Sequence, residues 1–316
     1  MSSLRICDHE STLPLVSRAL GRTASMVSIL TLGGEGILRT HGRMKEAAAI
    51  IEHALCRGFT AFDTAPAWAS SESYLGATLG GHRDSVFLAS KTHDRTRDGS
   101  WRLLDESLRR LKTDVLDLWQ IQDVRTRSQV KQILSSCGAA AACREAWEQG
   151  IVRSIGVTGH SDPDVLAELL AGFDADVVTS PVNAAECHLL SFHRMIQPIA
   201  AQQHCGMIAR HVTTDGRSIS LGVSNLAEAL GYALSQPSIN TVIVDCETPE
   251  DIDLHYLAVQ DFHPFSIPML RSLEERTKRH SRLLTFYRER QSTSAVFNDG
   301  SEHQQQDSPA TGSIHE

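Results

Sequence analysis

Three short stretches decide the fold: GFTAFDTAPAW (58–68), VFLASKTH (86–93) and DVLDLWQIQD (114–123). Each is an apolar run that ends at or just before a polar residue, namely Asp63, Lys91 and Gln122. The carboxyl ends of parallel strands lie at one edge of a sheet, and binding residues gather at that edge. If these runs are neighbouring parallel strands, a carboxylate, an ammonium group and an amide share one pocket.

The alternation of apolar runs and helical stretches continues along the chain. We expect eight buried strands, at 28–32, 60–62, 86–90, 115–121, 152–157, 176–180, 206–209 and 241–244. The segments between them carry apolar residues at helical spacing, and Gly58, Gly150 and Gly172 stand where helix C-caps belong. Eight strand–helix units in about 230 residues match an α/β fold, the single-domain (β/α)8 or TIM barrel. A doubly wound sheet is the alternative, although no GxGxxG motif opens a helix.

The ends of the chain lack this pattern. We expect an N-terminal arm over 1–27, the barrel over 28–288 and a tail over 289–316. The tail is polar and rich in Ser, Gln and Gly. It offers too little apolar surface to offset its ordering entropy, so we expect it to be disordered.

Composition narrows the class of protein. The chain has 316 residues, 41% of them hydrophobic, and a net charge of −8, which does not suggest a nucleic-acid partner. No segment approaches the ~20 apolar residues that span a bilayer, so no membrane association is expected. The seven cysteines are scattered without a CxxC pair. A reduced, cytoplasmic protein is therefore favoured over a disulfide framework.

Six motifs, in order and at matching spacings, resemble the aldo-keto reductases from about Ser28 to Val259. They are GFTAFDTAPAW, SESYLG (71–76), SKTH (90–93), LDESLRRLKTDVLDLWQI (104–121), EQGIVRSIGVTGH (148–160) and TVIVDCETPEDI (241–252). The resemblance implies a (β/α)8 barrel that reduces an aldehyde or ketone with a nicotinamide cofactor. In this family a hydride reaches the carbonyl carbon while an acid protonates the oxygen.

Two of the four catalytic positions that the resemblance implies are changed. Asp63 and Lys91 match the family aspartate and lysine, whereas Trp68 replaces the proton-donating tyrosine and Gln122 replaces the histidine. An indole N–H donates a hydrogen bond but not a proton near neutral pH. A positioned general acid contributes about 10²–10⁴-fold to the rate. Gln122 is the milder change, because an amide N–H still polarises a carbonyl.

Another group would have to supply the proton. Lys91 could do so if burial lowers its pKa, and His93 and His160 also follow strand ends. Tyr74 lies on the helix after Trp68, where a packing role is the simpler interpretation.

The residues that the resemblance assigns to the cofactor are also altered. Thr158 and Asn183 match the side chains that hold the nicotinamide amide, and Arg210 stands where the family often stacks a ring. The stretch that matches the family's adenosine-phosphate clamp is acidic and places Asp251 and His255 at its key positions. Carboxylates there would repel a 2′-phosphate, so NAD(H) is expected over NADP(H).

Three function classes remain open. The first is a nicotinamide-dependent oxidoreductase acting on a small carbonyl compound with an altered proton donor. The second is a catalytically inactive barrel that binds a dinucleotide or a protein partner. The third is a metal hydrolase built on His93, His160, His211 and Asp245, but no recognisable ligand spacing supports it, so no metal is expected.

Overall fold

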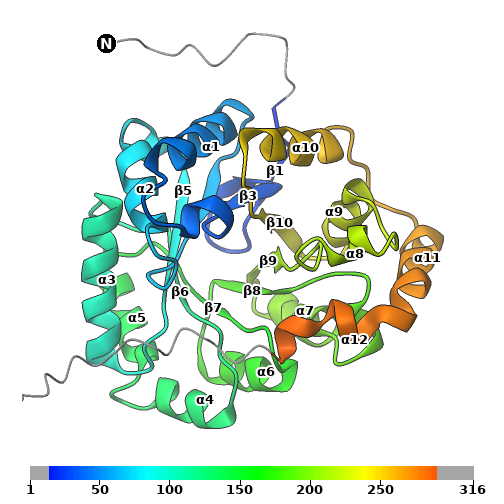
Figure 1. Cartoon of the computed structure of the whole chain (residues 1–316). Coiled ribbons are helices and arrows are strands. Elements are labelled where there is room, and N and C mark those ends of the chain that lie inside the picture. The colour runs from blue at the N-terminus through cyan, green and yellow to red at the C-terminus, as the bar shows by residue number, and fades with distance from the viewer. Residues whose placement is uncertain (1–13, 290–316) are drawn as a thin grey trace, which may run out of the picture.

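A closed barrel of eight parallel strands forms the body of the protein in this computed structural model, which describes residues 14–289 (Figure 1). The strand order around the barrel is β10-β3-β4-β5-β6-β7-β8-β9. The strands are β3 (Leu30–Gly33), β4 (Ala61–Asp63), β5 (Phe87–Thr92), β6 (Leu118–Ile121), β7 (Ile155–Thr158), β8 (Val177–Pro181), β9 (Gly206–Arg210) and β10 (Ile239–Val244). The expected barrel is thus confirmed, with strand ends shifted by a few residues.

The barrel strands are continuous apolar runs because helices cover their outer face and side chains fill their inner face. Helices surround the barrel in the order α1 (Met44–Cys56), α2 (Ser71–Thr78), α3 (Arg97–Leu111), α4 (Arg127–Leu134), α5 (Ala139–Glu148), α6 (Pro163–Gly172), α7 (Phe192–Gln202), α8 (Arg217–Ser220), α9 (Leu226–Leu234) and α10 (Pro249–Val259). Capping side chains start several of them: Thr96 caps α3, and capping boxes open α9 at Asn225 and α10 at Thr248.

A short hairpin closes the amino-terminal end of the barrel. Its strands are β1 (Ser17–Ala19) and β2 (Met26–Ser28), which pair antiparallel. Leu20 and Val27 are fully buried and join the cluster of side chains that fills the barrel interior, which includes Phe87, Leu118 and Ile208. The part of the expected N-terminal arm that the structure describes therefore plugs the barrel.

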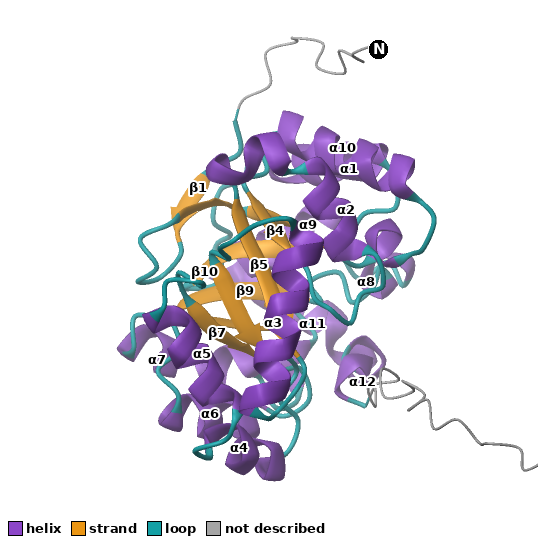
Figure 2. Cartoon of the chain, turned by 90° about the vertical axis from the view of Figure 1, so that its left-hand side faces the viewer, coloured by secondary structure: helices purple, strands orange, loops and turns teal. Residues whose placement is uncertain are grey.

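A C-terminal extension covers part of the opposite end (Figure 2). It consists of α11 (Ile267–Thr277), η4 (Lys278–His280), α12 (Ser281–Leu284) and η5 (Phe286–Arg288). Thr277 donates to the carbonyl oxygen of Ala184 at 2.9 Å, which ties the extension to the loop after β8. The expected tail lies outside the described residues, apart from Glu289.

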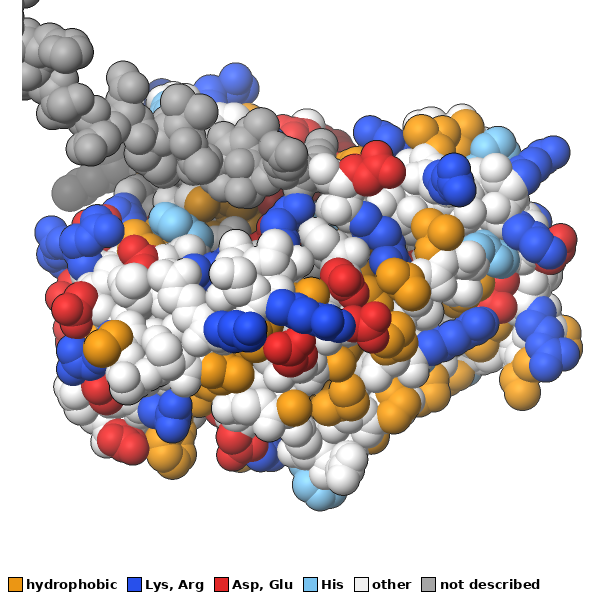
Figure 3. All heavy atoms as spheres, turned by 90° about the horizontal axis from the view of Figure 1, so that it is seen from below, with side chains coloured by type: hydrophobic (Ala, Val, Ile, Leu, Met, Phe, Trp, Pro, Cys, Tyr) orange, Lys and Arg blue, Asp and Glu red, His pale blue; other side chains and the backbone are white. Residues whose placement is uncertain are grey.

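The outer surface carries charges of both signs, interspersed on the face shown in Figure 3. Arg127 on α4 and Glu168 on α6, for example, form an ion pair at 3.2 Å. Exposed pairs of this kind contribute at most about 1 kcal/mol each. No helix among residues 14–289 is long and apolar enough to cross a membrane.

Two details differ from the sequence-based expectations. Gly58 and Gly150 do adopt left-handed backbone angles after their helices, with φ of 81° and 72°, but Gly172 is the last residue of α6, beside Leu134. Five of the described cysteines carry free thiols, whereas Cys56 is disulfide-bonded. The expectation that every thiol is reduced is therefore wrong at Cys56.

We predict that Leu20→Ala destabilises the protein by about 2–5 kcal/mol, because it leaves a cavity at the bottom of the barrel. Urea denaturation followed by circular dichroism measures this. Met26→Ala in the same hairpin is the control: this side chain is 60% exposed and should cost less than about 0.5 kcal/mol. Equal effects of the two substitutions would show that the hairpin does not act as a plug.

Candidate functional site

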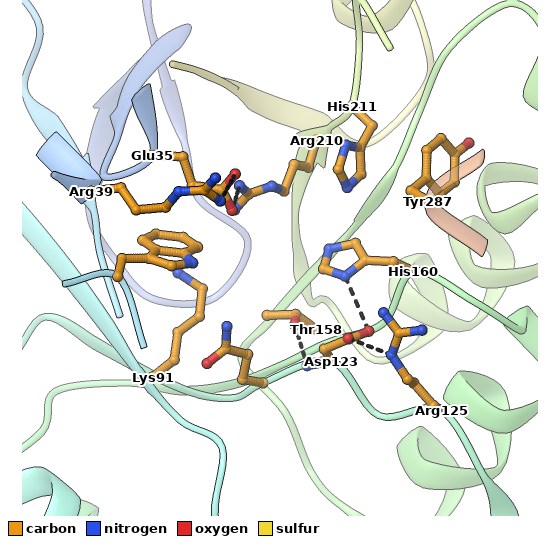
Figure 4. A pocket seen from close by; sticks show the side chains of 12 residues that line it. Glu35, Arg39, Lys91, Asp123, Arg125, Thr158, His160, Arg210, His211 and Tyr287 are labelled. Carbon is orange, nitrogen blue, oxygen red and sulfur yellow. Dashed lines mark hydrogen bonds and ion pairs between the residues drawn. The ribbon is translucent and has the colours of Figure 1, made fainter. Parts of the chain in front are cut away.

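A chamber of about 140 Å³ opens at the carboxyl ends of the strands (Figure 4). Its walls come from the carboxyl ends of six strands, from the loops that follow most of them and from the C-terminal extension. The residues that line it are Glu35, Arg39, Trp68, Lys91, Gln122, Asp123, Arg125, Thr158, His160, Arg210, His211 and Tyr287. The chamber thus collects side chains separated by about 250 positions in the sequence, as strand ends of a barrel do.

The floor of the chamber holds a buried ion pair. Lys91 Nζ lies 2.6 Å from both carboxylate oxygens of Asp63 and 2.8 Å from the carbonyl oxygen of Thr64. An ammonium group has three N–H donors, and these three acceptors match them. Burial lowers the pKa of Lys91, while the carboxylate of Asp63 opposes that shift. The pair expected from the strand ends therefore forms, with Lys91 fully engaged.

Trp68 covers this pair. Its ring centroid lies 4.4 Å from Lys91 Nζ and 4.9 Å from Arg210 Cζ, so two cations rest against one indole. Such cation–π contacts contribute about 2 kcal/mol or more each when desolvated. Gly34 allows this arrangement, because a Cβ at that position would stand 3.0 Å from Trp68 Cε3 and 2.3 Å from Ser71 Oγ.

Arg210, the last residue of β9, is buried among carboxylates. It lies 2.6 Å from Glu35, 3.7 Å from Asp245 and 4.0 Å from Asp63. Burial opposes the charge of the guanidinium, but Glu35 and Asp245 outweigh it and raise the pKa of Arg210. Burial raises the pKa of Asp245. Arg210 thus contacts Trp68 and serves as the shared counter-ion of three acids.

Two glutamines near the carboxyl end of β6 face different surroundings. Gln122 lines the chamber, and its Oε1 is buried without a hydrogen-bond partner among residues 14–289. Gln120 points into the barrel, where its Nε2 lies 3.4 Å from Asp63 and its Oε1 accepts from Thr179 at 2.6 Å. Gln120 therefore supports the ion pair from below, whereas Gln122 has hydrogen-bonding capacity to offer a ligand.

A second polar group lies across the chamber. His160 Nδ1 is 3.3 Å from Asp123 Oδ1, and Arg125 Nε is 2.6 Å from Asp123 Oδ2 (Figure 4). The ring of His211 meets His160 edge-on at 5.2 Å and stacks on Tyr287 at 4.6 Å. Burial lowers the pKa of His211 to about 4, so His211 is neutral at neutral pH.

The two residues expected to hold a nicotinamide amide are already engaged. Thr158 Oγ1 accepts from the backbone N–H of Asp123 at 2.7 Å. Asn183 Nδ2 donates to the carbonyl oxygen of His211 at 3.1 Å and to the Tyr287 hydroxyl at 3.2 Å. Its Oδ1 accepts from the backbone N–H groups of Ala185 and Glu186. Thr158 lines the chamber, whereas Asn183 lies behind Tyr287 with its hydrogen bonds filled.

A groove of about 640 Å³ shares Arg210 and His211 with the chamber and runs past η1 (Gly36–Arg39) towards α10. Asp251 and His255 line it, together with Glu35, Asp215, Asp245 and Glu247. The Asp251 carboxylate caps α10 by accepting from the backbone N–H groups of Glu247 and Thr248. Burial lowers the pKa of His255, so it adds no positive charge. The groove therefore carries five carboxylates against two guanidinium groups, those of Arg39 and Arg210.

Other residues singled out in the sequence do not join the chamber. His93 is exposed, and Tyr74 is buried with its hydroxyl bonded to the backbone of Thr40 and Arg43. Of the four residues weighed as metal ligands, His160 and His211 do line the chamber and meet, but within the described part of the chain no group of three His, Cys, Asp or Glu could hold a metal ion.

Five chamber residues escaped the sequence-based reasoning: Glu35, Arg39, Asp123, Arg125 and Tyr287. Gln120, which supports Asp63 from inside the barrel, escaped it as well. Asp123 directly follows Gln122, and Glu35 stands just past the first barrel strand, so the strand-end rule could have found both. No such signal pointed to Tyr287, because the extension that carries it does not follow a barrel strand.

Comparison with known proteins agrees with this architecture. Residues 30–217 match the model of the Aldo/keto reductase family. The chain is 27% identical over 173 residues to 6-dehydroglucose reductase of Novosphingobium aromaticivorans, covering 49% of this chain and 55% of that protein. It is 30% identical over 155 residues to Aldo-keto reductase YhdN of Bacillus subtilis, covering 45% of each. The chain therefore spans about half the length of the curated relatives it matches.

Solved structures show the same fold. The holo form of aldo-keto reductase AKR11C1 from Bacillus halodurans superimposes with a TM-score of 0.72 at 18% identity, covering 83% of this chain and 96% of that one. The thermostable aldo-keto reductase Tm1743 gives a TM-score of 0.67 at 21% identity, covering 83% and 100%. With the family model matching more than half of its length, this chain belongs to the aldo/keto reductase family.

Proposed function

We propose that the protein is a nicotinamide-dependent oxidoreductase that interconverts a small aldehyde or ketone and its alcohol. The observation that carries this proposal is the buried Asp63–Lys91 pair at the floor of a chamber whose wall offers two unpartnered polar atoms, Gln122 Oε1 and His160 Nε2. Buried polar groups are normally hydrogen-bonded, so atoms left without partners at a cavity wall mark where a polar ligand would bind.

The chamber residues would have different roles towards a bound carbonyl group. Gln122 can donate an amide hydrogen bond to the carbonyl oxygen and stabilise the charge that develops there. Trp68 closes one wall and excludes water from the Asp63–Lys91 pair. Trp68 is not an acid, and Lys91 directs its N–H groups at Asp63 and Thr64. Proton transfer must therefore use a different group from the one the family uses.

The groove, at about 640 Å³, lies within the roughly 300–1,000 Å³ typical of ligand pockets. The family cofactor, NAD(P)H, could occupy it if one contact changes at the inner end of the site. A bound nicotinamide would supply the hydride for the carbonyl carbon. Thr158, Arg210, Asp251 and His255 border the space in which it would lie, in the chamber or along the groove. Asn183 would hold its amide only after releasing the Tyr287 hydroxyl.

We predict that Tyr287→Phe strengthens NADH binding by about three- to tenfold. The substitution removes the hydroxyl from Asn183 Nδ2, and a freed donor is worth about 1 kcal/mol when a ligand uses it. Isothermal titration calorimetry measures the change. Tyr232→Phe is the matched control, because it removes a hydroxyl bonded to Glu274 away from the chamber. Unchanged binding in Tyr287→Phe would mean that Asn183 does not contact the cofactor.

NADH should bind at least about tenfold more tightly than NADPH. The groove places Glu247 and Asp251 near α10 without a neutralising cation from His255, and each nearby carboxylate repels a 2′-phosphate by about 1 kcal/mol. Titration of both dinucleotides at two salt concentrations tests this, since the difference should shrink at high salt. Tighter binding of NADPH would place the phosphate near Arg39 or Arg217 instead.

The decisive test of the proposed function restores the family residues. Trp68→Tyr puts a phenol beside the Lys91 ammonium, which favours the ionised phenol, and Gln122→His adds a second carbonyl contact. The double substitution should raise NADH-dependent reduction of 4-nitrobenzaldehyde by about tenfold or more. Because catalytic residues act as a unit, the gain should exceed the product of the single effects.

Trp147→Tyr on α5 is the control for this experiment, because Trp147 is exposed far from the chamber. It should leave turnover unchanged. Measurable NADH binding without turnover in the wild type and the double variant would instead favour a catalytically inactive barrel that binds a dinucleotide. Trp68, which is buried against Lys91 and cannot donate a proton near neutral pH, is the observation on the side of that second function.

A further inference from the structure

His160 and Asp123 form a dyad that faces the chamber. The dyad is joined through Nδ1 of the imidazole, at 3.3 Å from Asp123 Oδ1. The other ring nitrogen, Nε2, is buried and has no hydrogen-bond partner among residues 14–289. His160 lines the same chamber as Gln122, Lys91 and Trp68, so its unpartnered nitrogen borders the space available to a ligand.

The carboxylate of Asp123 is held firmly in place. Arg125 Nε contacts Oδ2 at 2.6 Å, and the backbone N–H of Asp123 donates to Thr158 Oγ1 at 2.7 Å. The backbone at Asp123 has a φ of 46°, a left-handed conformation that costs energy for a residue other than glycine and often occurs at functional sites. This turn directs the side chain from the end of β6 towards the loop after β7.

The charges around the dyad favour an ionised aspartate. Burial opposes ionisation of Asp123, but the hydrogen bond and charge of His160 and the charge of Arg125 outweigh it, and the pKa of Asp123 is held below its ordinary value. An ionised carboxylate only accepts hydrogen bonds, so the imidazole carries a proton on Nδ1 in both of its states. Nε2 is then the nitrogen that gains and loses a proton.

We propose that His160 is the proton donor of this enzyme and that Asp123 positions it, replacing the tyrosine whose place Trp68 occupies. This inference rests on the proposed function. During reduction, the carbonyl carbon accepts a hydride from the nicotinamide, the π electrons of the C=O bond move to oxygen, and that oxygen takes the proton from Nε2. The products are the alcohol, the oxidised nicotinamide and a neutral imidazole; oxidation of the alcohol reverses each transfer.

The other titratable groups that face the chamber are less suited to this role. Lys91 is saturated by Asp63 and Thr64. Burial lowers the pKa of His211 to about 4, so it has no proton to give at neutral pH. Burial raises the pKa of Tyr287, whose hydroxyl is bonded to Asn183. The Arg125 guanidinium is paired with Asp123 and neutralises its charge in part.

The kinetic test compares His160→Gln, Asp123→Asn and the wild type in NADH-dependent reduction of 4-nitrobenzaldehyde. His160→Gln keeps a polar side chain but cannot deliver a proton, so kcat should fall by about 100-fold or more with little change in KM. His82→Gln, an exposed histidine in η2 (Gly80–Ser85), is the control and should behave as wild type.

A readout independent of turnover tests the dyad itself. The nitrogen chemical shifts of His160 at high pH should report a single tautomer with the proton on Nδ1. In Asp123→Asn the acceptor loses its charge, and a mixture of tautomers should appear. Unchanged shifts in Asp123→Asn would overturn the positioning role of Asp123.

Rescue separates a chemical role from a structural one. In a Trp68→Tyr background the phenol can donate the proton, so the loss caused by His160→Gln should shrink to less than about tenfold. A loss that stays the same in that background, or wild-type kinetics in His160→Gln alone, would overturn the assignment of His160 while leaving the proposed function intact. Absence of both NADH binding and turnover in the wild type would overturn the proposed function and this inference with it.

Discussion

A lysine enclosed in a barrel remains charged only if acceptors satisfy its donors. Lys91 meets this condition through Asp63 and the carbonyl oxygen of Thr64. Removing one member of a buried ion pair costs about 3–5 kcal/mol, because the other charge is left without compensation. The rest of the chamber depends on this constraint. Gln120 supports Asp63 from within the barrel, and Trp68 seals Lys91 from solvent.

At the mouth of the barrel, Arg210 likewise compensates buried charges. Its guanidinium neutralises Glu35 and Asp245 and rests on Trp68, so the indole is in contact with two cations. A neutral ring at the position of Arg210 would leave those carboxylates close together without compensation. Trp68 and Arg210 are therefore coupled: each stabilises the other in a site with little access to water.

The C-terminal extension adds a constraint that the barrel alone does not impose. Tyr287 stacks on His211, and its hydroxyl accepts a hydrogen bond from Asn183 Nδ2. These contacts link η5 to the loops after β8 and β9. His211 in turn meets His160, so the extension and the Asp123–His160 dyad share one wall of the chamber. Any movement of the extension that admits a ligand at Asn183 would also change the surroundings of the dyad. Binding at Asn183 and the setting of His160 are therefore physically linked.

The sequence by itself determined the barrel and the placement of Asp63, Lys91, Trp68 and Gln122 at one mouth. Apolar periodicity is a local property, and parallel strands bring their carboxyl ends to one edge. Only the tertiary structure decided which atoms these groups meet. Residues two apart in a strand share a face, so Gln120 and Gln122 both point inward; because β6 ends at Ile121, Gln120 lies inside the barrel and Gln122 lies in the chamber above it. The partnership of Asp123 with His160, of Glu35 with Arg210 and of Tyr287 with Asn183 joins residues 37, 175 and 104 positions apart. No local pattern encodes such pairs, because they depend on backbone angles in the loops and on where the C-terminal extension docks.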